Sequence, residues 1–215
     1  MVAWKDHFRN CVAAFDFQPW FFDGEDKNMR ALANKEAFVD WFAQEPGAIG
    51  NPYRDEGFYV RELTNVSLTI RPRNIVEFGT NIGLSTLLLR ILNPNAEITT
   101  IDTLSMQYMP GDIKVVTGML AKHNGVKAHY LLGDSNQFTA TDVDMCFIDA
   151  DHSYGAVVAD SEQAWNNRNK DYSAIVWHDH NERHPGVIQA VSEFIVRKRI
   201  LLNMLPDSST VWSYK

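Results

Sequence analysis

The sequence predicts an α/β fold: a doubly wound, mostly parallel seven-stranded sheet with a C-terminal antiparallel hairpin strand and an N-terminal helical extension. After residue 73, short apolar runs alternate with longer stretches of helical periodicity, which is the pattern of strand–helix–strand units. Most of these runs are too continuously apolar for a strand with one wet face, so they suit a parallel sheet covered on both sides. The last two runs stand too close together for a helix to connect them.

Five runs rich in apolar and β-branched residues are expected as strands, at 74–78, 97–101, 128–132, 143–148 and 174–177. Helical periodicity between and after them predicts helices at 84–92, 112–124, 154–168 and 186–198. Because crossovers between parallel strands are right-handed, this order gives a Rossmann-like sheet.

The C-terminal end departs from this pattern. Runs at 200–205 and 210–214 are separated only by residues 206–209. Four residues cannot form a crossover helix, so we expect a hairpin that adds an antiparallel strand to the sheet.

Residues 1–62 are rich in aromatic side chains, with 13 of the 25 in the chain. We expect two helices here that pack these rings against the domain formed by 63–215 or against a second subunit in a homodimer. The alternative is a lid over an apolar substrate. No linker rich in Gly, Ser or Pro separates the two segments, so 1–62 is interpreted as an extension of the domain.

Composition excludes several classes of protein. The net charge of −7 argues against a broad basic surface for nucleic acid. No apolar run approaches the roughly 18 residues that span a bilayer, and Lys5 and Asp6 precede any signal-like stretch. The two cysteines, Cys11 and Cys146, are too few and too far apart for a disulfide framework or a thiolate zinc site. We therefore expect a cytoplasmic protein without membrane or nucleic-acid partners.

The first expected strand runs through a glycine turn, residues 77–85, into a helix. A nucleotide binds at this kind of join in a Rossmann-like sheet. Asn81 stands where the dinucleotide motif has its second glycine, which argues against a pyrophosphate, although Asn tolerates a left-handed backbone. Glu77, two residues before Gly79, would repel a diphosphate and attract an ammonium group.

This turn resembles the cofactor loop of class I S-adenosylmethionine-dependent methyltransferases. The resemblance implies that Glu77 faces the methionine amino group, through a direct or a water-mediated contact, and that Ser85 faces the methionine carboxylate. It also implies that Asp102 meets the ribose and Asp134 the adenine, while the alternative for each acid is a strand-end turn or a helix cap. The cofactor-binding residues expected on this basis are Glu77, Gly79, Thr80, Asn81, Gly83, Ser85, Asp102, Thr103, Asp134, Ser135 and Asp149.

Acidic and imidazole side chains follow the fourth and fifth strands, in Asp149-Ala150-Asp151-His152 and His178-Asp179-His180. In a doubly wound sheet these strand ends border the ligand crevice. Carboxylates are costly to bury without a cation or a donor, so the cluster predicts a wet pocket or a metal site. The alternative is that Asp151 and Ser153 only cap the following helix.

The two segments resemble the small-molecule O-methyltransferases and the related cephalosporin hydroxylase-like proteins. The resemblance implies methylation of a small-molecule hydroxyl, with a divalent ion held by Asp149, Asp179 and His180. His180 replaces the Asn of the family, so manganese, iron or zinc would suit the site as readily as magnesium. His152 is expected as the general base, with Asp149 and His178 as further catalytic residues. Because side chains alternate along a strand, His178 is expected to point to the face of the sheet opposite to that of Asp179.

Three other functions remain open at this stage. A hydroxylase would use iron at the same Asp and His positions. A glycosyltransferase would use the Asp149-Ala150-Asp151 segment as its metal motif, but the acidic glycine turn would then have no role. A non-enzymatic binding module would retain only a relic of the pocket. Methylation of nucleic-acid amino groups is disfavoured, because no Pro-Pro-aromatic segment follows the fourth strand.

Overall fold

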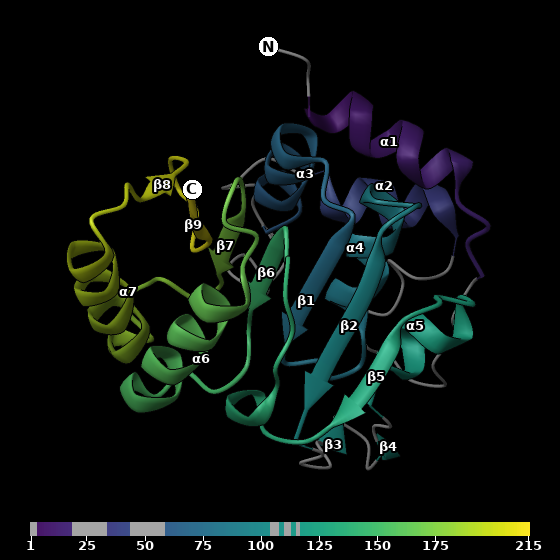
Figure 1. Cartoon of the computed structure of the whole chain (residues 1–215). Coiled ribbons are helices and arrows are strands. Elements are labelled where there is room, and N and C mark those ends of the chain that lie inside the picture. Colours follow the sequence, from purple (N-terminus) through teal and green to yellow (C-terminus); the bar gives the residue numbers. More distant parts are fainter. Residues whose placement is uncertain (1–3, 19–33, 44–58, 104–107, 110–112, 115–116) are drawn as a thin grey trace.

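The computed structural model describes residues 4–18, 34–43, 59–103, 108–109, 113–114 and 117–215 (Figure 1). Its main feature is a seven-stranded sheet in the order β5-β2-β1-β6-β7-β9-β8. The strands are β1 (Asn74–Phe78), β2 (Glu97–Asp102), β5 (His129–Leu132), β6 (Met145–Ile148), β7 (Ala174–Trp177), β8 (Asn203–Met204) and β9 (Val211–Tyr214).

The first five of these strands are parallel, and β9 pairs antiparallel with both β7 and β8. This confirms the expected sheet and its C-terminal hairpin. The chain order reverses between the adjacent strands β1 and β6, which creates a crevice beyond their carboxyl ends.

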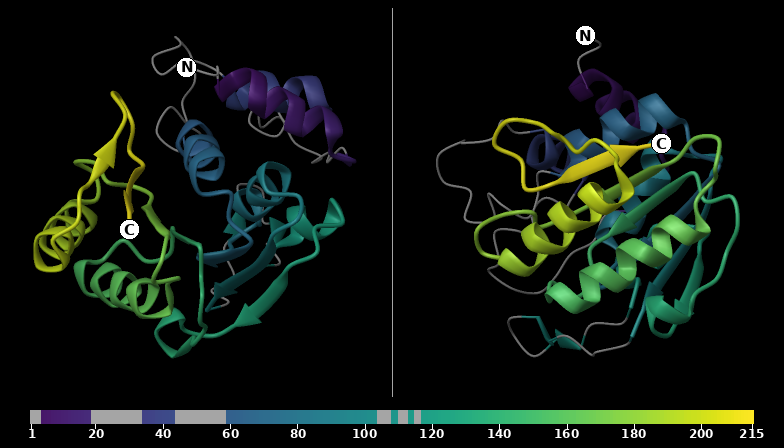
Figure 2. Two further views of the ribbon diagram at one scale, coloured as in Figure 1. Left: turned by 45° about the horizontal axis from the view of Figure 1, so that its top comes forward. Right: turned by 60° about the vertical axis from the view of Figure 1, so that its left-hand side comes forward.

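Helices cover both faces of the sheet, as the views in Figures 1 and 2 show. One core contains Ile75 and Phe147 from the sheet and the buried sides of the helices α1 to α4, whereas the other contains Phe78 and Trp177 with the helices α6 and α7. Strand residues thus alternate between the two cores. The helices are α1 (Trp4–Ala14), α2 (Lys35–Phe42), α3 (Tyr59–Ile70), α4 (Leu84–Leu92), α5 (Met119–His123), α6 (Tyr154–Asn167) and α7 (Pro185–Lys198).

Of the helix expected at 112–124, the structure has α5, whereas the described residues 113–114 form a strand, so the prediction was wrong there. A short antiparallel ribbon, β3 (Tyr108–Met109) and β4 (Ile113–Lys114), precedes it. Gly118 has a left-handed φ of +70° at the start of α5, and a Cβ there would lie 2.5 Å from the ring of Tyr130. The backbone therefore bends at Gly118, and a helix cannot continue through it.

The described N-terminal helices pack into the domain core. Phe38 is fully buried, with its ring centroid 5.0 Å from that of Phe17 and 4.8 Å from that of Phe42. Helix α3 runs without interruption through residues 62 and 63, where the boundary of the extension was expected. Other aromatic residues of the extension, including Trp20, Phe21 and Phe22, lie outside the described residues. No helix in the described ranges is long and apolar enough to cross a membrane.

Candidate active site

A cavity of about 800 Å³ opens beyond the carboxyl ends of the parallel strands. It extends from the glycine turn after β1 to the residues that follow β2, β5, β6 and β7. This is where the reversal of strand order places a ligand in an open α/β sheet. Its walls include Tyr59, Gly79, Thr80, Asn81, Ser85, Asp102, Thr103, Asp134, Ser135, Asp149, Asp151, His152, Asp160, His178 and Asp179.

The glycine turn has a fixed shape. Gly79 has a φ of +94°, and a Cβ there would lie 2.0 Å from the carbonyl oxygen of Asp149. Asn81 has a φ of +45°, which confirms that Asn supports the left-handed turn. One carboxylate oxygen of Asp102 accepts hydrogen bonds from the backbone amides of Thr80 at 3.0 Å and Asn81 at 2.8 Å. The end of β2 therefore holds the turn that follows β1.

Two of the expected cofactor residues are not on the cavity wall. Glu77 is fully buried behind the turn, where Thr86 donates a hydrogen bond to it at 2.5 Å, and burial raises its pKa to about 7. Gly83 packs against the start of α5, since a Cβ there would lie 2.9 Å from Gly118 Cα. The structure therefore does not place the Glu77 carboxylate where it can contact a ligand in the cavity directly.

Helix α6 contributes to the cavity wall an acid that sequence reasoning missed, Asp160, which lies next to the residues that follow β5. Asp134 accepts a hydrogen bond from the Asn136 amide at 2.9 Å and caps a short 3-10 turn. Ser135 donates a hydrogen bond to Asp160, which is 2% exposed on α6. Burial is the main cause that raises the pKa of Asp160 to about 6. A signal was present in the sequence, because Asp160 lies one helical turn after Ala156 on the face of α6 that lines the cavity.

At the other end of the cavity, Asp and His side chains converge. His178 Nδ1 lies 3.1 Å from Asp149 Oδ1 and 3.3 Å from Asp179 Oδ2. His152 Nε2 lies 3.1 Å from Asp179 Oδ2 and 3.7 Å from Asp149 Oδ1. The expectation that His178 points away was wrong: Asp179 has a φ of +55°, so the alternation of the strand ends there and both side chains reach the cavity.

The four groups hold one another in charged states. Contacts with the carboxylates of Asp149 and Asp179 raise the pKa of His152 to about 9. Burial lowers the pKa of His178, but the same two carboxylates outweigh it and raise that pKa to about 10. Burial would raise the pKa of both acids, yet the imidazoles hold the pKa of Asp149 at about 2 and that of Asp179 well below its usual range. The corner is thus a compact set of two cations and two anions.

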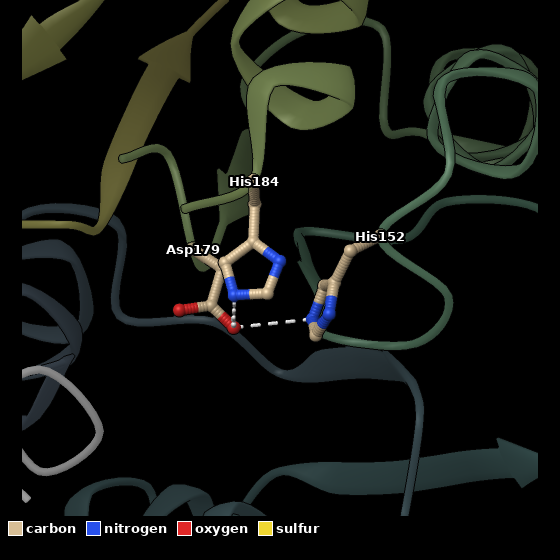
Figure 3. A group of neighbouring side chains, drawn as sticks. All are labelled: His152, Asp179 and His184. Carbon is tan, nitrogen blue, oxygen red and sulfur yellow. Dashed lines mark ion pairs between the residues drawn. The ribbon is translucent and has the colours of Figure 1, made fainter. Parts of the chain in front are cut away.

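His184 joins this corner, whereas His180 does not. His184 Nε2 lies 3.9 Å from Asp179 Oδ2, and its ring centroid is 4.3 Å from that of His152 (Figure 3). Among the described residues, two sets of possible metal ligands have all donor atoms within 4.8 Å of one another. They are His152, Asp179 and His184, and Asp149, His178 and Asp179. The backbone amide of His180 instead donates to the Ser209 carbonyl oxygen at 2.8 Å, and His180 belongs to neither set.

Residues 76–180 match the family described as a methyltransferase domain. No curated protein matches the sequence. The matched segment contains β1, β2, β5, β6 and β7, and therefore most of the cavity wall.

Solved structures extend the similarity to nearly the whole chain. The methyltransferase PaMTH1 of Podospora anserina, bound to S-adenosylhomocysteine (SAH), has 14% identity and a TM-score of 0.57, with 92% of this chain and 99% of that chain covered. An O-methyltransferase of Bacillus cereus in complex with SAH has 17% identity and a TM-score of 0.52, with 82% and 86% covered. Given the matched segment, the sheet order and the cavity at the strand ends, the chain has the fold of these methyltransferase structures, and residues 76–180 are similar in sequence to a methyltransferase domain.

Proposed function

We propose that this chain transfers the methyl group of S-adenosylmethionine to a hydroxyl group of a small molecule. The observation that supports this most is that one cavity contains strand-end acids at one end and a set of imidazoles and carboxylates at the other. The first end suits a nucleoside with an amino-acid tail, and the second suits proton removal from an acceptor.

The cofactor would bind along the turn after β1. Asp102 would accept hydrogen bonds from the ribose hydroxyls, and Asp134 with Ser135 would face the adenine. Gly79, Thr80 and Asn81 present backbone at the cavity wall, where the absence of a Cβ at Gly79 allows close approach. Methyl transfer from a sulfonium is an in-line displacement, so a large part of the rate would come from holding the acceptor oxygen against the methyl carbon.

The acceptor hydroxyl must lose its proton during the transfer. His152 and His178 both line the cavity, and either ring can act as the general base only in its neutral form, because the neighbouring carboxylates raise the pKa of His152 to about 9 and that of His178 to about 10. The carboxylates of Asp149 and Asp179 would orient the rings and stabilise the imidazolium that forms. Carboxylate–imidazole pairs of this kind are suited to proton transfer at a fixed atom.

The same corner has the donors that a divalent ion requires. His152 Nε2 is buried and has no hydrogen-bond partner, although Asp179 lies 3.1 Å away. Three imidazoles and two carboxylates converge there, drawn from Asp149, His152, His178, Asp179 and His184. A divalent ion held by such donors lowers the pKa of a bound hydroxyl.

Calorimetric titration of the purified chain with SAH tests the cofactor assignment. We expect one SAH per chain, and about tenfold weaker binding for Asp102→Asn, because an amide accepts hydrogen bonds less strongly than a carboxylate. Asp171→Asn, at an exposed residue outside the cavity wall, is the matched control. Absence of SAH binding by the unaltered chain would contradict the proposal.

The product identifies the reaction. Incubation with S-adenosylmethionine and a panel of phenols, catechols and sugar hydroxyls should give a product heavier than the acceptor by the mass of one methylene group. A gain equal to one oxygen atom would instead indicate a hydroxylase on the same fold.

A further inference from the structure

Two imidazoles and one carboxylate converge from three separate segments of the chain. His152 precedes α6, Asp179 follows β7 and His184 caps the start of α7. Both rings are turned toward the carboxylate in Figure 3. His152 Nε2 and His184 Nε2 lie 3.1 Å and 3.9 Å from the same oxygen, Asp179 Oδ2.

These distances suit three ligands of one ion. Donors about 2.1 Å from a common metal are about 3.0 to 3.4 Å apart when they occupy neighbouring positions of an octahedron or a tetrahedron. The contact between His152 and Asp179 falls in this range, and the contact between His184 and Asp179 would close by about half an ångström. Asp179 is already fixed by the left-handed backbone at its own position.

The contact between His152 Nε2 and Asp179 Oδ2, at 3.1 Å, is an ion pair. His152 Nε2 is inaccessible to solvent and has no hydrogen-bond partner. The proton that His152 carries in this ion pair lies between the two side chains. A divalent ion in contact with both would displace that proton and bind the nitrogen lone pair and the carboxylate together.

His178 is placed differently from these two histidines. Its Nδ1 already makes a hydrogen bond with Asp149 Oδ1 at 3.1 Å. The rings of His178 and Tyr59 also pack against each other, with their centroids 5.0 Å apart and their planes at 82°. Asp149 and His178 therefore hold each other in place directly, although His178 Nε2, like His152 Nε2, is buried without a hydrogen-bond partner.

We propose that His152, Asp179 and His184 bind one divalent transition-metal ion, with iron, cobalt, nickel or zinc preferred to magnesium. Two imidazoles with one carboxylate are a donor set for these metals, whereas magnesium requires oxygen ligands. Three protein ligands leave positions open toward the cavity, where, on the proposed function, the acceptor hydroxyl would bind. With His152 committed to the ion, His178 remains paired with Asp149.

Cobalt titration of the chelator-stripped chain tests the site without any assay of activity. Co²⁺ bound by imidazole has visible absorption bands that report its ligands and geometry. We expect one Co²⁺ per chain, and binding weakened by at least about 100-fold in His152→Ala and in His184→Ala, since the loss of even an outer partner of a ligand costs about 10- to 100-fold. Magnesium should not compete at equal concentration. His129→Ala, at an exposed histidine on the edge strand β5, is the matched control and should bind Co²⁺ as the unaltered chain does.

Two further variants distinguish this set of ligands from sets that include Asp149 or His180. Asp149→Asn should keep Co²⁺ binding within about tenfold, because Asp149 would act only beyond the ligands. His180→Ala should leave Co²⁺ affinity unchanged. The proposal is overturned if Co²⁺ does not bind, if Asp149→Asn abolishes binding while His184→Ala keeps it, or if His180→Ala weakens binding as much as His184→Ala.

SAH titration of the same samples separates this proposal from the proposed function. Loss of Co²⁺ binding with normal SAH binding overturns the metal site alone. Normal Co²⁺ binding without SAH binding overturns the methyltransferase function and leaves the metal site standing.

Discussion

Glu77 has a fully buried carboxyl group, and burial raises its pKa from 4.5 to about 7. Between these pH values the folded protein keeps a proton that the unfolded chain has lost, so stability falls as the pH rises. Glu77→Gln removes this dependence. Relative to the unaltered chain, the free energy of unfolding of the variant should rise by roughly 2–3 kcal/mol between pH 5 and pH 8, measured by urea denaturation.

The control for this prediction is Glu97→Gln, which changes an exposed glutamate at the start of β2. It should leave the pH dependence as it is in the unaltered chain. An equal response of the two variants would show that Glu77 is not the buried group responsible.

Gly79 meets two separate steric constraints, which a pair of variants can distinguish. Gly79→Ala places a Cβ 2.0 Å from the Asp149 carbonyl oxygen and also forces a left-handed alanine. Gly125→Ala forces only the left-handed backbone, because nothing lies within 4 Å of its Cβ. We expect a loss of about 1 kcal/mol in unfolding free energy for Gly125→Ala and of at least about 3 kcal/mol for Gly79→Ala. Equal losses would show that the turn does not touch the end of β6.

Most of the residues that sequence reasoning singled out line the cavity, but the sequence did not reveal how each side chain is used. The acids after β2, β5 and β6 were found because strand ends meet at one edge of a parallel sheet. His178 was misplaced because the left-handed backbone at Asp179 is not visible in a residue pattern. His184 and Asp160 come close to the site through the packing of α7 and α6, which depends on contacts far apart in the sequence.

At the scale of single elements, the end of α7 offers a stabilising substitution. Arg199 caps this helix with a φ of +55°, a conformation that suits glycine better than arginine. Arg199→Gly should therefore increase the unfolding free energy by roughly 0.5–1 kcal/mol. Ser192→Gly, at an exposed position inside the same helix, should decrease it by about 0.5 kcal/mol, because glycine destabilises a helix interior.

Thermal and urea denaturation of both variants would measure these opposite effects. A loss of stability in Arg199→Gly would mean that the arginine side chain contributes more at this position than its backbone conformation costs.

The elements that the sequence predicted best are those with a strong local pattern. The helices α4, α6 and α7 were expected within one residue of their observed ends, because each combines helical periodicity with a clear start or stop. Residues 113–114 were expected as helix and form a strand, and α5 begins only after Gly118, where the Tyr130 ring from another part of the fold approaches the backbone. Local periodicity does not record such a contact.

At the scale of the whole molecule, the described N-terminal helices share one core with the sheet. Phe38 is fully buried among aromatic rings of α1, α2 and the segment after α1. Phe38→Ala should cost about 3–5 kcal/mol of unfolding free energy within a single cooperative transition followed by circular dichroism. Asp40→Ala, an exposed change on α2, should cost at most about 0.5 kcal/mol.

A separate early transition in Phe38→Ala, with the main transition unchanged, would show that residues 1–62 unfold independently of the sheet. The sequence could not decide this question, because aromatic content alone does not reveal what the rings pack against. The uninterrupted course of α3 from the extension into the domain favours a single unit.

The hydrogen bonds from Asp102 to the turn after β1 have a consequence for the kinetics of ligand capture. Both amides are satisfied without any bound molecule, so the loop is preorganised and little entropy remains to be lost on association. Deuterium should therefore replace the amide hydrogens of Thr80 and Asn81 slowly even in the apo protein, and encounter with a nucleoside should not have to wait for the loop to order.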